Sequence, residues 1–486
     1  MTLSAGTKAA LAAVLLTLPA SAENGPVAEG KARAPDERPN LVLILSDDHR
    51  WDALGAAGNP KIHTPVLDRL AREGVYFPQA TIHVSQCPPS RATLLTGLPP
   101  HLHGMHSLQA QEPESLTAAG LCAPGTLPSL LREAGYRTAL VGKWHLGPEP
   151  WECGFDEVLT WIPAGAALFE NPDSLARGRS RELHKVEGFT QELLVDDAVN
   201  FVERNRSESA PYFLWLAVTA PHFPYAPNPK RIRKLYAGRE PADLLPPGFP
   251  EGTEVHAHWV EYYEAVSFLD EQVGRLLEAV ERSKRRTVIV FLGDNGYMMG
   301  ERGIGLQGAA GKVVPYESSL RVPFLMAGVP GLTGTVPSSV SSLDLPPTLL
   351  SLAGVPIPAT WPGRDLTKVL HAGGETSFAV SEWTDEKSRQ FGSLAYRVIR
   401  TPHFKLIDWQ NPEHKDELYD LEADPHERHN LMDSPDHAAI LRDLSRQLLD
   451  WRRRTADPKL EAEGSRKVDE IPADAGRVDE ERRPPG

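Results

Sequence analysis

The stretch LVLILSDD, residues 41–48, joins an unbroken apolar run to two adjacent aspartates. Five consecutive aliphatic residues are typical of a strand buried on both faces, as the strands of a parallel sheet are. The run stops at Ser46, and Asp47 and Asp48 follow directly. We therefore expect a buried strand that places two carboxylates just past its carboxyl end.

Three more apolar runs end in polar residues in the same way. In an open α/β sheet, ligands bind in the crevice outside the carboxyl ends of the strands. A solvated loop or a helix cap would account for any single run, but four such runs favour one shared site. The runs are TALVG (138–142), followed by Lys143 and His145; YFLWLAV (212–218), followed by His222; and TVIVFLG (287–293), followed by Asp294 and Asn295.

Helices are expected between these strands. The segment TPVLDRLAREG (64–74) has a threonine cap, a proline in the first turn and a glycine stop, and residues 127–134 repeat the scheme. Residues 258–280 carry apolar side chains three or four positions apart, which indicates an amphipathic helix. Alternating strands and helices predict an α/β fold with a large doubly wound mixed sheet flanked by helices.

The pattern changes after about residue 374. Three short apolar runs have no helix between them, and a single helix follows. We predict a smaller C-terminal α+β domain over residues 375–456, after the main α/β domain at residues 39–374. Residues 457–486 contain no aromatic and few large apolar side chains, which predicts a disordered tail. The three runs are at 377–383, 393–400 and 404–409, and the helix is at 436–454.

The first 22 residues have the layout of a secretory signal peptide. Lys8 precedes an apolar run that is too short to span a bilayer, and the small residues Ala20, Ser21 and Ala22 form a cleavage site. We expect cleavage near Ala22, a linker over residues 23–38, and an exported protein, periplasmic or secreted, without a stable membrane anchor. The alternative is an uncleaved anchor.

The charge balance excludes some classes of partner. The 486 residues include 51 lysines and arginines against 65 aspartates and glutamates, a net charge of -14. Such an excess of acidic groups speaks against nucleic acid or an anionic membrane as the main partner. It leaves open a small anionic substrate in a locally basic pocket.

The oxygen-bearing residues after the strands indicate a metal site. Asp47, Asp48, Asp294 and Asn295 offer only hard oxygen ligands, which suit calcium or magnesium, whereas zinc prefers histidine or cysteine. A cation would also relieve the repulsion between adjacent carboxylates. Because calcium tolerates irregular geometry, we prefer Ca²⁺ to Mg²⁺.

A second set of residues suits an anion. Lys143, Lys312, His145 and His222 supply positive charges or hydrogen-bond donors, and lysine binds tetrahedral oxyanions well. For each lysine, a solvated surface position is the alternative.

Cys87 stands at the start of an expected helix in SQCPPSRATLLTG (85–97). Prolines favour the first helical turn, and the positive end of a helix lowers the pKa of a thiol there. Arg91 lies one turn further along and can face the same site. These features allow either a cysteine-dependent hydrolase or a buried, inert cysteine.

The motif from Cys87 to Arg91, followed by Thr96 and Gly97, resembles the C-x-P-S-R signature of the formylglycine-dependent sulfatases. These are the type I sulfatases of the alkaline-phosphatase-like superfamily. The segment GYRTALVGKWHLG (135–147) is similar to the second signature of that family. Five more segments follow the family's order: LILSDDHRWDALG (43–55), APHFPY (220–225), GDNGY (293–297), GKVVPYESSLRVPF (311–324) and DELYDLEADPHERHNL (416–431).

The resemblance implies a modified residue and a set of roles. A maturation enzyme would oxidise Cys87 to Cα-formylglycine, whose hydrate attacks the sulfur of a sulfate ester and later expels sulfate. By the same resemblance, Asp47, Asp48, Asp294 and Asn295 hold the metal together with residue 87. Arg91 and Lys143 steady residue 87, Lys143 also reaches the sulfate, His145 acts as base, and His222 and Lys312 bind sulfate and help to protonate the leaving oxygen.

The substrate class stays open at this stage. Export and a sulfate pocket favour a sulfated carbohydrate or polysaccharide fragment. The alternatives are a phosphonate or phosphate ester hydrolase of the same superfamily and a non-catalytic carbohydrate-binding relative. Six residues are candidates for the pocket rim, with a structural role as the alternative for each: His49, Arg50, Trp51, His101, His103 and Arg302.

Three further features concern details of the chain. Pro88 fills the free position of the signature, and Arg302 stands where many relatives have histidine. Cys122 and Cys153 are the two cysteines that remain once Cys87 is converted, and in an exported protein we predict that they pair. The alternative is two free, buried thiols.

Overall fold

The computed structural model of the chain describes residues 38–108, 120–122, 125–306, 311–371, 377–384 and 394–458. The expected signal peptide (1–22), nearly all of the linker and the tail from residue 459 onward lie outside these ranges, so their predicted roles stay predictions. Within the ranges, every helix is too short or too polar to cross a bilayer.

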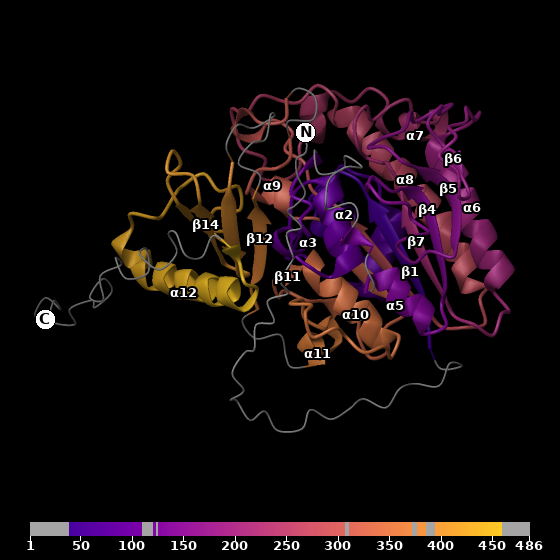
Figure 1. Ribbon diagram of the computed structural model, residues 1–486. Helices are drawn as coiled ribbons and strands as arrows, with labels where there is room; N and C mark the ends of the chain where they lie inside the picture. Colours follow the sequence, from indigo (N-terminus) through magenta and orange to yellow (C-terminus); the bar gives the residue numbers. More distant parts are fainter. Residues whose placement is uncertain are drawn as a thin grey trace, which may run out of the picture. The chain divides into compact units, whose positions relative to one another are not determined.

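A nine-stranded mixed sheet forms the centre of the fold, in the order β10-β2-β9-β8-β1-β7-β4-β5-β6 (Figure 1). β1 (Asn40–Ser46) pairs in parallel with β7 (Tyr212–Ala217) on one side and β8 (Thr287–Gly293) on the other, and β7 pairs in parallel with β4 (Arg137–Lys143). The four predicted strands are therefore confirmed as neighbours whose carboxyl ends share one edge. The other strands are β2 (Val75–Tyr76), β5 (Glu157–Ile162), β6 (Ala176–Arg177), β9 (Phe324–Ala327), which is antiparallel to β8, and β10 (Gly334–Thr335).

Helices cover both faces of this sheet because β1 sends alternate side chains to opposite sides. Leu41, Leu43 and Leu45 enter a core shared with α2 (Cys87–Thr96), α5 (Leu127–Glu133) and α10 (Leu345–Leu352). Val42 and Ile44 enter a second core with α1 (Pro65–Glu73), α6 (Thr190–Asn205) and α8 (Trp259–Glu281). The predicted doubly wound arrangement is thus confirmed. The short elements α3 (Pro100–His103), α7 (Lys230–Arg233), α9 (Glu317–Leu320), α11 (Leu366–His371), β3 (Ala80–Thr81) and β11 (Val340–Ser341) complete this part.

The C-terminal part contains a four-stranded antiparallel sheet and one long helix. The helix is α12 (Ala438–Arg454), which lies beside this sheet (Figure 1). Its Leu444 and Leu448 pack with Ile399 and Leu406 of the sheet. This agrees with the predicted α+β organisation, although the domain boundary at residues 374 and 375 stays a prediction. The strands are β12 (Ala379–Trp383), β13 (Tyr396–Arg400), β14 (Phe404–Trp409) and β15 (Glu417–Asp420).

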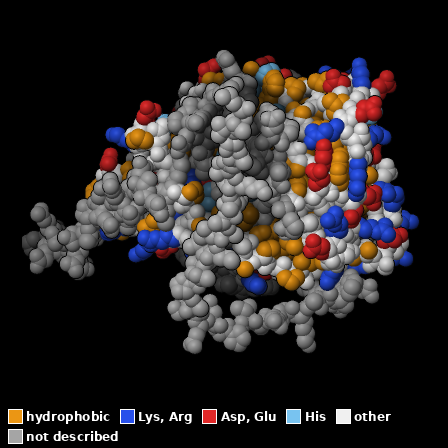
Figure 2. Space-filling view, in the orientation of Figure 1, with side chains coloured by type: hydrophobic (Ala, Val, Ile, Leu, Met, Phe, Trp, Pro, Cys, Tyr) orange, Lys and Arg blue, Asp and Glu red, His pale blue; other side chains and the backbone are white. Residues whose placement is uncertain are grey.

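Cys122 and Cys153 form a disulfide, with their Cα atoms 4.4 Å apart, so the predicted pairing is confirmed. The bond links the segment before α5 to the segment after β4. Figure 2 shows lysine and arginine side chains interspersed with aspartates and glutamates on the visible surface. The visible part of this face therefore has no patch of a single charge.

Candidate active site

Both aspartates that follow β1 reach the same point. Successive side chains of a strand point to opposite faces, but Asp48 has a left-handed φ of 58°, which breaks this alternation. The Cys87 thiol donates to Asp47 Oδ1 at 3.3 Å, and the Lys312 ammonium donates to Asp48 Oδ1 at 2.8 Å. The same ammonium lies 3.1 Å from Cys87 Sγ. Cys87 therefore sits where the carboxylates and Lys312 meet.

Cys87 is the first residue of α2, as predicted, but its thiol is not activated. Burial raises the pKa of the thiol to about 12, with the charge of Asp47 adding to the effect. The expectation that the helix end lowers this pKa is wrong, because desolvation and a neighbouring carboxylate outweigh the helix dipole. The structure therefore argues against an unmodified thiolate nucleophile.

Arg91 connects α2 to two other segments of the site. Its Nη2 donates to Asp294 Oδ2 at 2.7 Å and its Nη1 donates to the Lys143 carbonyl at 2.7 Å. The neighbouring Ser90 hydroxyl donates to the Asp294 carbonyl at 2.6 Å. The first turn of α2 is thereby fixed to the segments after β8 and at the end of β4.

The buried charges of the site shift one another's titration. Burial works against ionisation of Asp47, but the positive charges of Lys143, His222 and Arg91 bring its pKa well below the usual range. Asp294 behaves in the opposite way, because burial and the charge of Asp47 raise its pKa to about 6. The crevice thus lacks enough positive charge to hold all its carboxylates comfortably ionised.

The donor set fits a hard divalent cation. Ligand atoms of Asp47, Asp48, Cys87 and His222 all lie within 4.8 Å of one another. The Asn295 amide nitrogen donates to Asp48 Oδ1 at 2.5 Å. The buried amide oxygen of Asn295 has no hydrogen-bond partner among the described residues. A buried carbonyl oxygen without a donor is the kind of atom that a cation satisfies. These residues do not distinguish Ca²⁺ from Mg²⁺.

The two histidines flank this set. His145 has a left-handed φ of 57°, and its buried Nδ1 has no partner in the part of the chain that the structure describes. Burial, then Lys143 and Arg91, keep the pKa of His145 well below its ordinary value. Burial also lowers the pKa of His222, whose Nε2 lies 3.7 Å from Asp48 Oδ2.

One contact in the site was absent from the sequence predictions. A Cβ atom on Gly165 would lie 2.8 Å from His145 Cε1, so only glycine leaves room for the imidazole. Gly165 lies in PAGAA (163–167), just after β5, in a region that resembles no family motif. The run of small residues is the only sequence signal for this close approach.

The candidate rim residues all have partners within the fold, which fits the structural alternative. Some of these partners are near in sequence, such as Asp52 for Arg50, and others are distant, such as Glu301. Arg50 is fully buried and pairs with Asp52 and Glu301, both at 2.7 Å. The others are similarly engaged: His49 with Ser46 and Ala53, Trp51 under the guanidinium of Arg321, His101 with Glu382, His103 with Thr93, and Arg302 with Tyr419 and Glu427.

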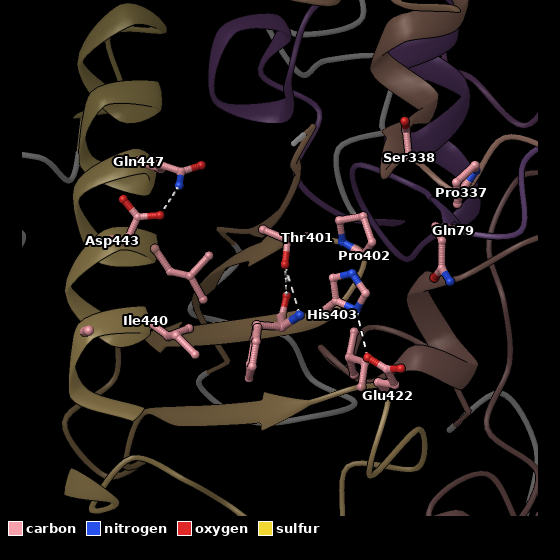
Figure 3. A pocket seen from close by; sticks show the side chains of 14 residues that line it. Gln79, Pro337, Ser338, Thr401, Pro402, His403, Glu422, Ile440, Asp443 and Gln447 are labelled. Carbon is pink, nitrogen blue, oxygen red and sulfur yellow. Dashed lines mark hydrogen bonds and ion pairs between the residues drawn. The ribbon is translucent and has the colours of Figure 1, made fainter. Parts of the chain in front are cut away.

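A cavity of about 960 Å³ lies elsewhere, between α12 and the turn after β13 (Figure 3). His403 and Glu422, 3.1 Å apart, stand on one side of it, and Asp443 and Gln447 stand on the other. None of the ten predicted site residues lines this cavity. The predicted site residues therefore lie at the edge of the nine-stranded sheet and not at this cavity.

Comparison with known proteins points to one family. The Sulfatase family model matches residues 39–355, and the model for the C-terminal part of N-sulphoglucosamine sulphohydrolase matches residues 305–454. An ulvan-active sulfatase of Formosa agariphila is 29% identical over 428 residues, which cover 85% of this chain and 80% of that protein. An N-acetylglucosamine-6-O-sulfatase of Bacteroides thetaiotaomicron is 27% identical, and the alignment covers 87% of each chain.

A solved structure has the same fold. It is a complex of a protein with its substrate D-glucosamine-2-N,6-O-disulfate, with a TM-score of 0.72 and 24% identity. The match covers 88% of this chain and 100% of the other. It confirms the alkaline-phosphatase-like fold with a small C-terminal domain.

Proposed function

The chain belongs to the sulfatase family and is a sulfuric ester hydrolase, and we propose that its substrate is a sulfated carbohydrate. The observation that carries the proposal is the meeting of Lys312, Cys87 and Asp48 at one buried point. Its relatives include an ulvan-active sulfatase and an N-acetylglucosamine-6-O-sulfatase, which supports a carbohydrate substrate. The related solved structure, which holds a disulfated glucosamine as its substrate, also supports a carbohydrate substrate.

The proposed nucleophile is Cα-formylglycine at position 87. Its support is the signature from Cys87 to Arg91 at the start of α2 and membership of the family. The partner that this requires is a formylglycine-generating maturation enzyme. When present, the hydrated aldehyde supplies an oxygen nucleophile and a second hydroxyl that expels sulfate.

The side chains of the site would divide the remaining work. Lys143 and Lys312 bind sulfate oxygens through charge-assisted hydrogen bonds. His145 takes a proton from the nucleophile, and His222, on the partly exposed side, gives a proton to the leaving alcohol. Arg91 holds the first turn of α2 in place.

The proposed metal is Ca²⁺, with Mg²⁺ as the less favoured ion. Asp47, Asp48, Asp294 and Asn295 would hold it beside residue 87. A divalent cation there would orient the nucleophilic oxygen and polarise the ester.

Two measurements test the activity. The matured enzyme is assayed against defined sulfated oligosaccharides and against a matched pair of aryl sulfate and aryl phosphate. We expect release of sulfate from at least one oligosaccharide and a higher kcat/KM for the aryl sulfate. Faster turnover of the phosphate would favour the phosphate or phosphonate hydrolase. Binding without turnover by matured protein would favour the carbohydrate-binding relative.

The maturation and export proposals have their own tests. After coexpression with a maturation enzyme, the peptide that contains residue 87 is expected to resist alkylation and to react with carbonyl reagents. A fully alkylatable Cys87 in active protein would exclude the aldehyde. Export to the periplasm or medium predicts a mature N-terminus close to Glu23, whereas retention of residues 1–22 would contradict cleavage.

A further inference from the structure

The residue after Lys312 has an unusual backbone conformation. Val313 is fully buried and has a left-handed φ of 73°. A β-branched residue in this region is a strong outlier, because its side chain crowds the neighbouring carbonyl groups. Such a conformation persists only where the surroundings hold it, and it often marks a functional position.

Val313 is held through both of its peptide groups. Its N–H donates to the Ser85 carbonyl at 2.9 Å, and its carbonyl accepts a hydrogen bond from the Tyr396 hydroxyl at 3.2 Å. Ser85 lies two residues before Cys87, so the first bond ties the Lys312 segment to the approach to α2. The second bond comes from β13, in the C-terminal sheet.

Tyr396 is built to hold this carbonyl. Its side chain is fully buried and packs edge-on against Trp409 of β14, with 5.6 Å between the ring centroids. Burial raises the pKa of Tyr396, so the hydroxyl keeps the proton that it donates. The bond has one direction only, because a carbonyl accepts and cannot donate.

Lys312 needs such support. A lysine side chain is long and flexible, and its ammonium reaches Asp48 Oδ1 and Cys87 Sγ at the same time. A shift of about 1 Å in a catalytic group is enough to reduce the rate strongly. The direction in which the side chain leaves the backbone is set by the peptide groups on either side of Lys312. The second of these carries the Val313 N–H that Ser85 binds, and Val313 joins it to the next peptide group, whose carbonyl Tyr396 binds.

We propose that Tyr396 is a positioning residue: it fixes the strained peptide of Val313 and so aims the Lys312 ammonium at residue 87. The proposal rests on the function proposed above for Lys312. It assigns to the C-terminal sheet a direct part in the geometry of the sulfate pocket.

The test is a double-mutant cycle of Tyr396→Phe and Lys312→Ala, with activity expressed per aldehyde at residue 87. With Lys312 present, Tyr396→Phe is expected to lower kcat/KM for an aryl sulfate about ten-fold and to weaken inhibition by inorganic sulfate. In the Lys312→Ala background, Tyr396→Phe is expected to cause no further loss, because the group that it positions is gone. Tyr136→Phe is the matched control, since that buried hydroxyl donates to the Pro39 carbonyl away from the site.

Val313→Gly provides a second variant if Tyr396→Phe folds poorly. Glycine enters both signs of φ freely, so the Lys312 segment loses its single conformation. This variant is expected to lower kcat/KM to a similar extent, again only when Lys312 is present.

The outcomes separate the two proposals. Equal losses from Tyr396→Phe with and without Lys312 would show a general structural role and overturn the positioning proposal. No loss from Tyr396→Phe, or the same loss from Tyr136→Phe, would also overturn it. If Lys312→Ala alone leaves kcat/KM unchanged, the sulfate-binding role of Lys312 fails, and the positioning proposal fails with it.

Discussion

Lys143 and Asp47 form a fully buried ion pair, with 2.5 Å between Nζ and Oδ2, although β7 lies between their strands. Lys143 ends β4, and Asp47 follows β1. Neighbouring strands lie ~4.8 Å apart, so the two side chains together cover the ~10 Å between next-but-one strands. The ion pair neutralises part of the negative charge of the neighbouring carboxylates of Asp47, Asp48 and Asp294.

Removal of Lys143 should therefore affect catalysis strongly. Lys143→Ala is expected to cost roughly 2–4 kcal/mol of transition-state stabilisation, as the loss of a preorganised donor does. The measurement is kcat/KM per aldehyde for an aryl sulfate, together with the Tm. Lys61→Ala is the control, because that exposed ammonium donates to the Leu245 carbonyl outside the site. A loss below three-fold in well-folded Lys143→Ala would argue against direct contact with sulfate.

Metal removal should lower stability as well as activity. A chelator is expected to lower the Tm, and Ca²⁺ should restore it, because an ion at 100 times its Kd stabilises the folded state by about 2.7 kcal/mol. Asn295→Ala is expected to reduce this calcium-dependent shift. In Asn205→Ala, which removes a buried amide of α6, the shift should remain. A Tm that is indifferent to chelator and to Ca²⁺ would contradict a metal at this site.

The stability of the fold should depend on pH through Asp270 of α8. Its buried carboxylate accepts hydrogen bonds from the amides of Val66 and Leu67, in the first turn of α1. Burial nevertheless raises its pKa from 3.8 to about 7. Because the pKa of Asp270 is raised in the folded state, its contribution to the free energy of unfolding is complete below about pH 4. This contribution is lost as pH rises through 7.

The comparison with Asp270→Asn isolates this contribution. Relative to wild type, the variant should gain up to about 4 kcal/mol between pH 4 and pH 8, since each pKa unit corresponds to about 1.4 kcal/mol. The difference in unfolding free energy, measured by denaturant titration at several pH values, checks the expectation. Glu281→Gln, which changes an exposed carboxylate at the end of the same helix, is the control. If the difference in unfolding free energy between Asp270→Asn and wild type does not vary with pH, Asp270 does not make the expected pH-dependent contribution.

The disulfide should contribute measurably to stability. The bridge closes a loop with a sequence separation of 31 residues, which corresponds to about 3–4 kcal/mol in the chain-entropy estimate. The Cys122→Ser/Cys153→Ser double variant is expected to have a lower Tm, and reducing agent should lower the Tm of wild type but not of the variant. Two reactive thiols in the unfolded, unreduced wild type would show that the bridge does not form.

The sheet and the meeting point of the site were predictable because they depend on local pattern and simple topology. Unbroken apolar runs identified the central strands, and parallel strands bring their carboxyl ends to one edge. That rule alone brings Asp47 and Asp294 together, although 247 positions separate them. A different local signal, the prolines that follow Cys87, placed this residue at the start of a helix.

Other features depend on contacts that no local pattern contains. Arg50 has the sequence character of a surface residue, and its burial depends on Glu301, far along the chain, as well as on the nearby Asp52. The short strand β15 buries just Leu418 and Tyr419, too few residues for a clear alternation. The left-handed φ of Val313 is likewise invisible, since valine ordinarily avoids it.

The helix α6 is a different case. Leu194, Ala198 and Phe201 have helical spacing, yet the helix is absent from the predicted elements. It follows directly on the stretch 163–190, which resembles no family motif. The segment contains no family motif, and only the periodicity of its apolar residues indicates a helix.

If Cys87 is converted as proposed, the topology of the sheet limits the time in which the conversion can take place. β1 needs β8 beside it, and β8 ends about 200 residues after Cys87 along the chain. Lys312, which lies 3.1 Å from the thiol, is synthesised later still. At ribosomal speeds of ~5–20 residues per second, roughly 10–45 s pass between the synthesis of Cys87 and that of Lys312. In the complete fold the side chain of Cys87 is 1% exposed and inaccessible to an enzyme that must bind residues 87–91. A variant that folds faster around this strand is therefore expected to leave more chains with an ordinary thiol and to be less active.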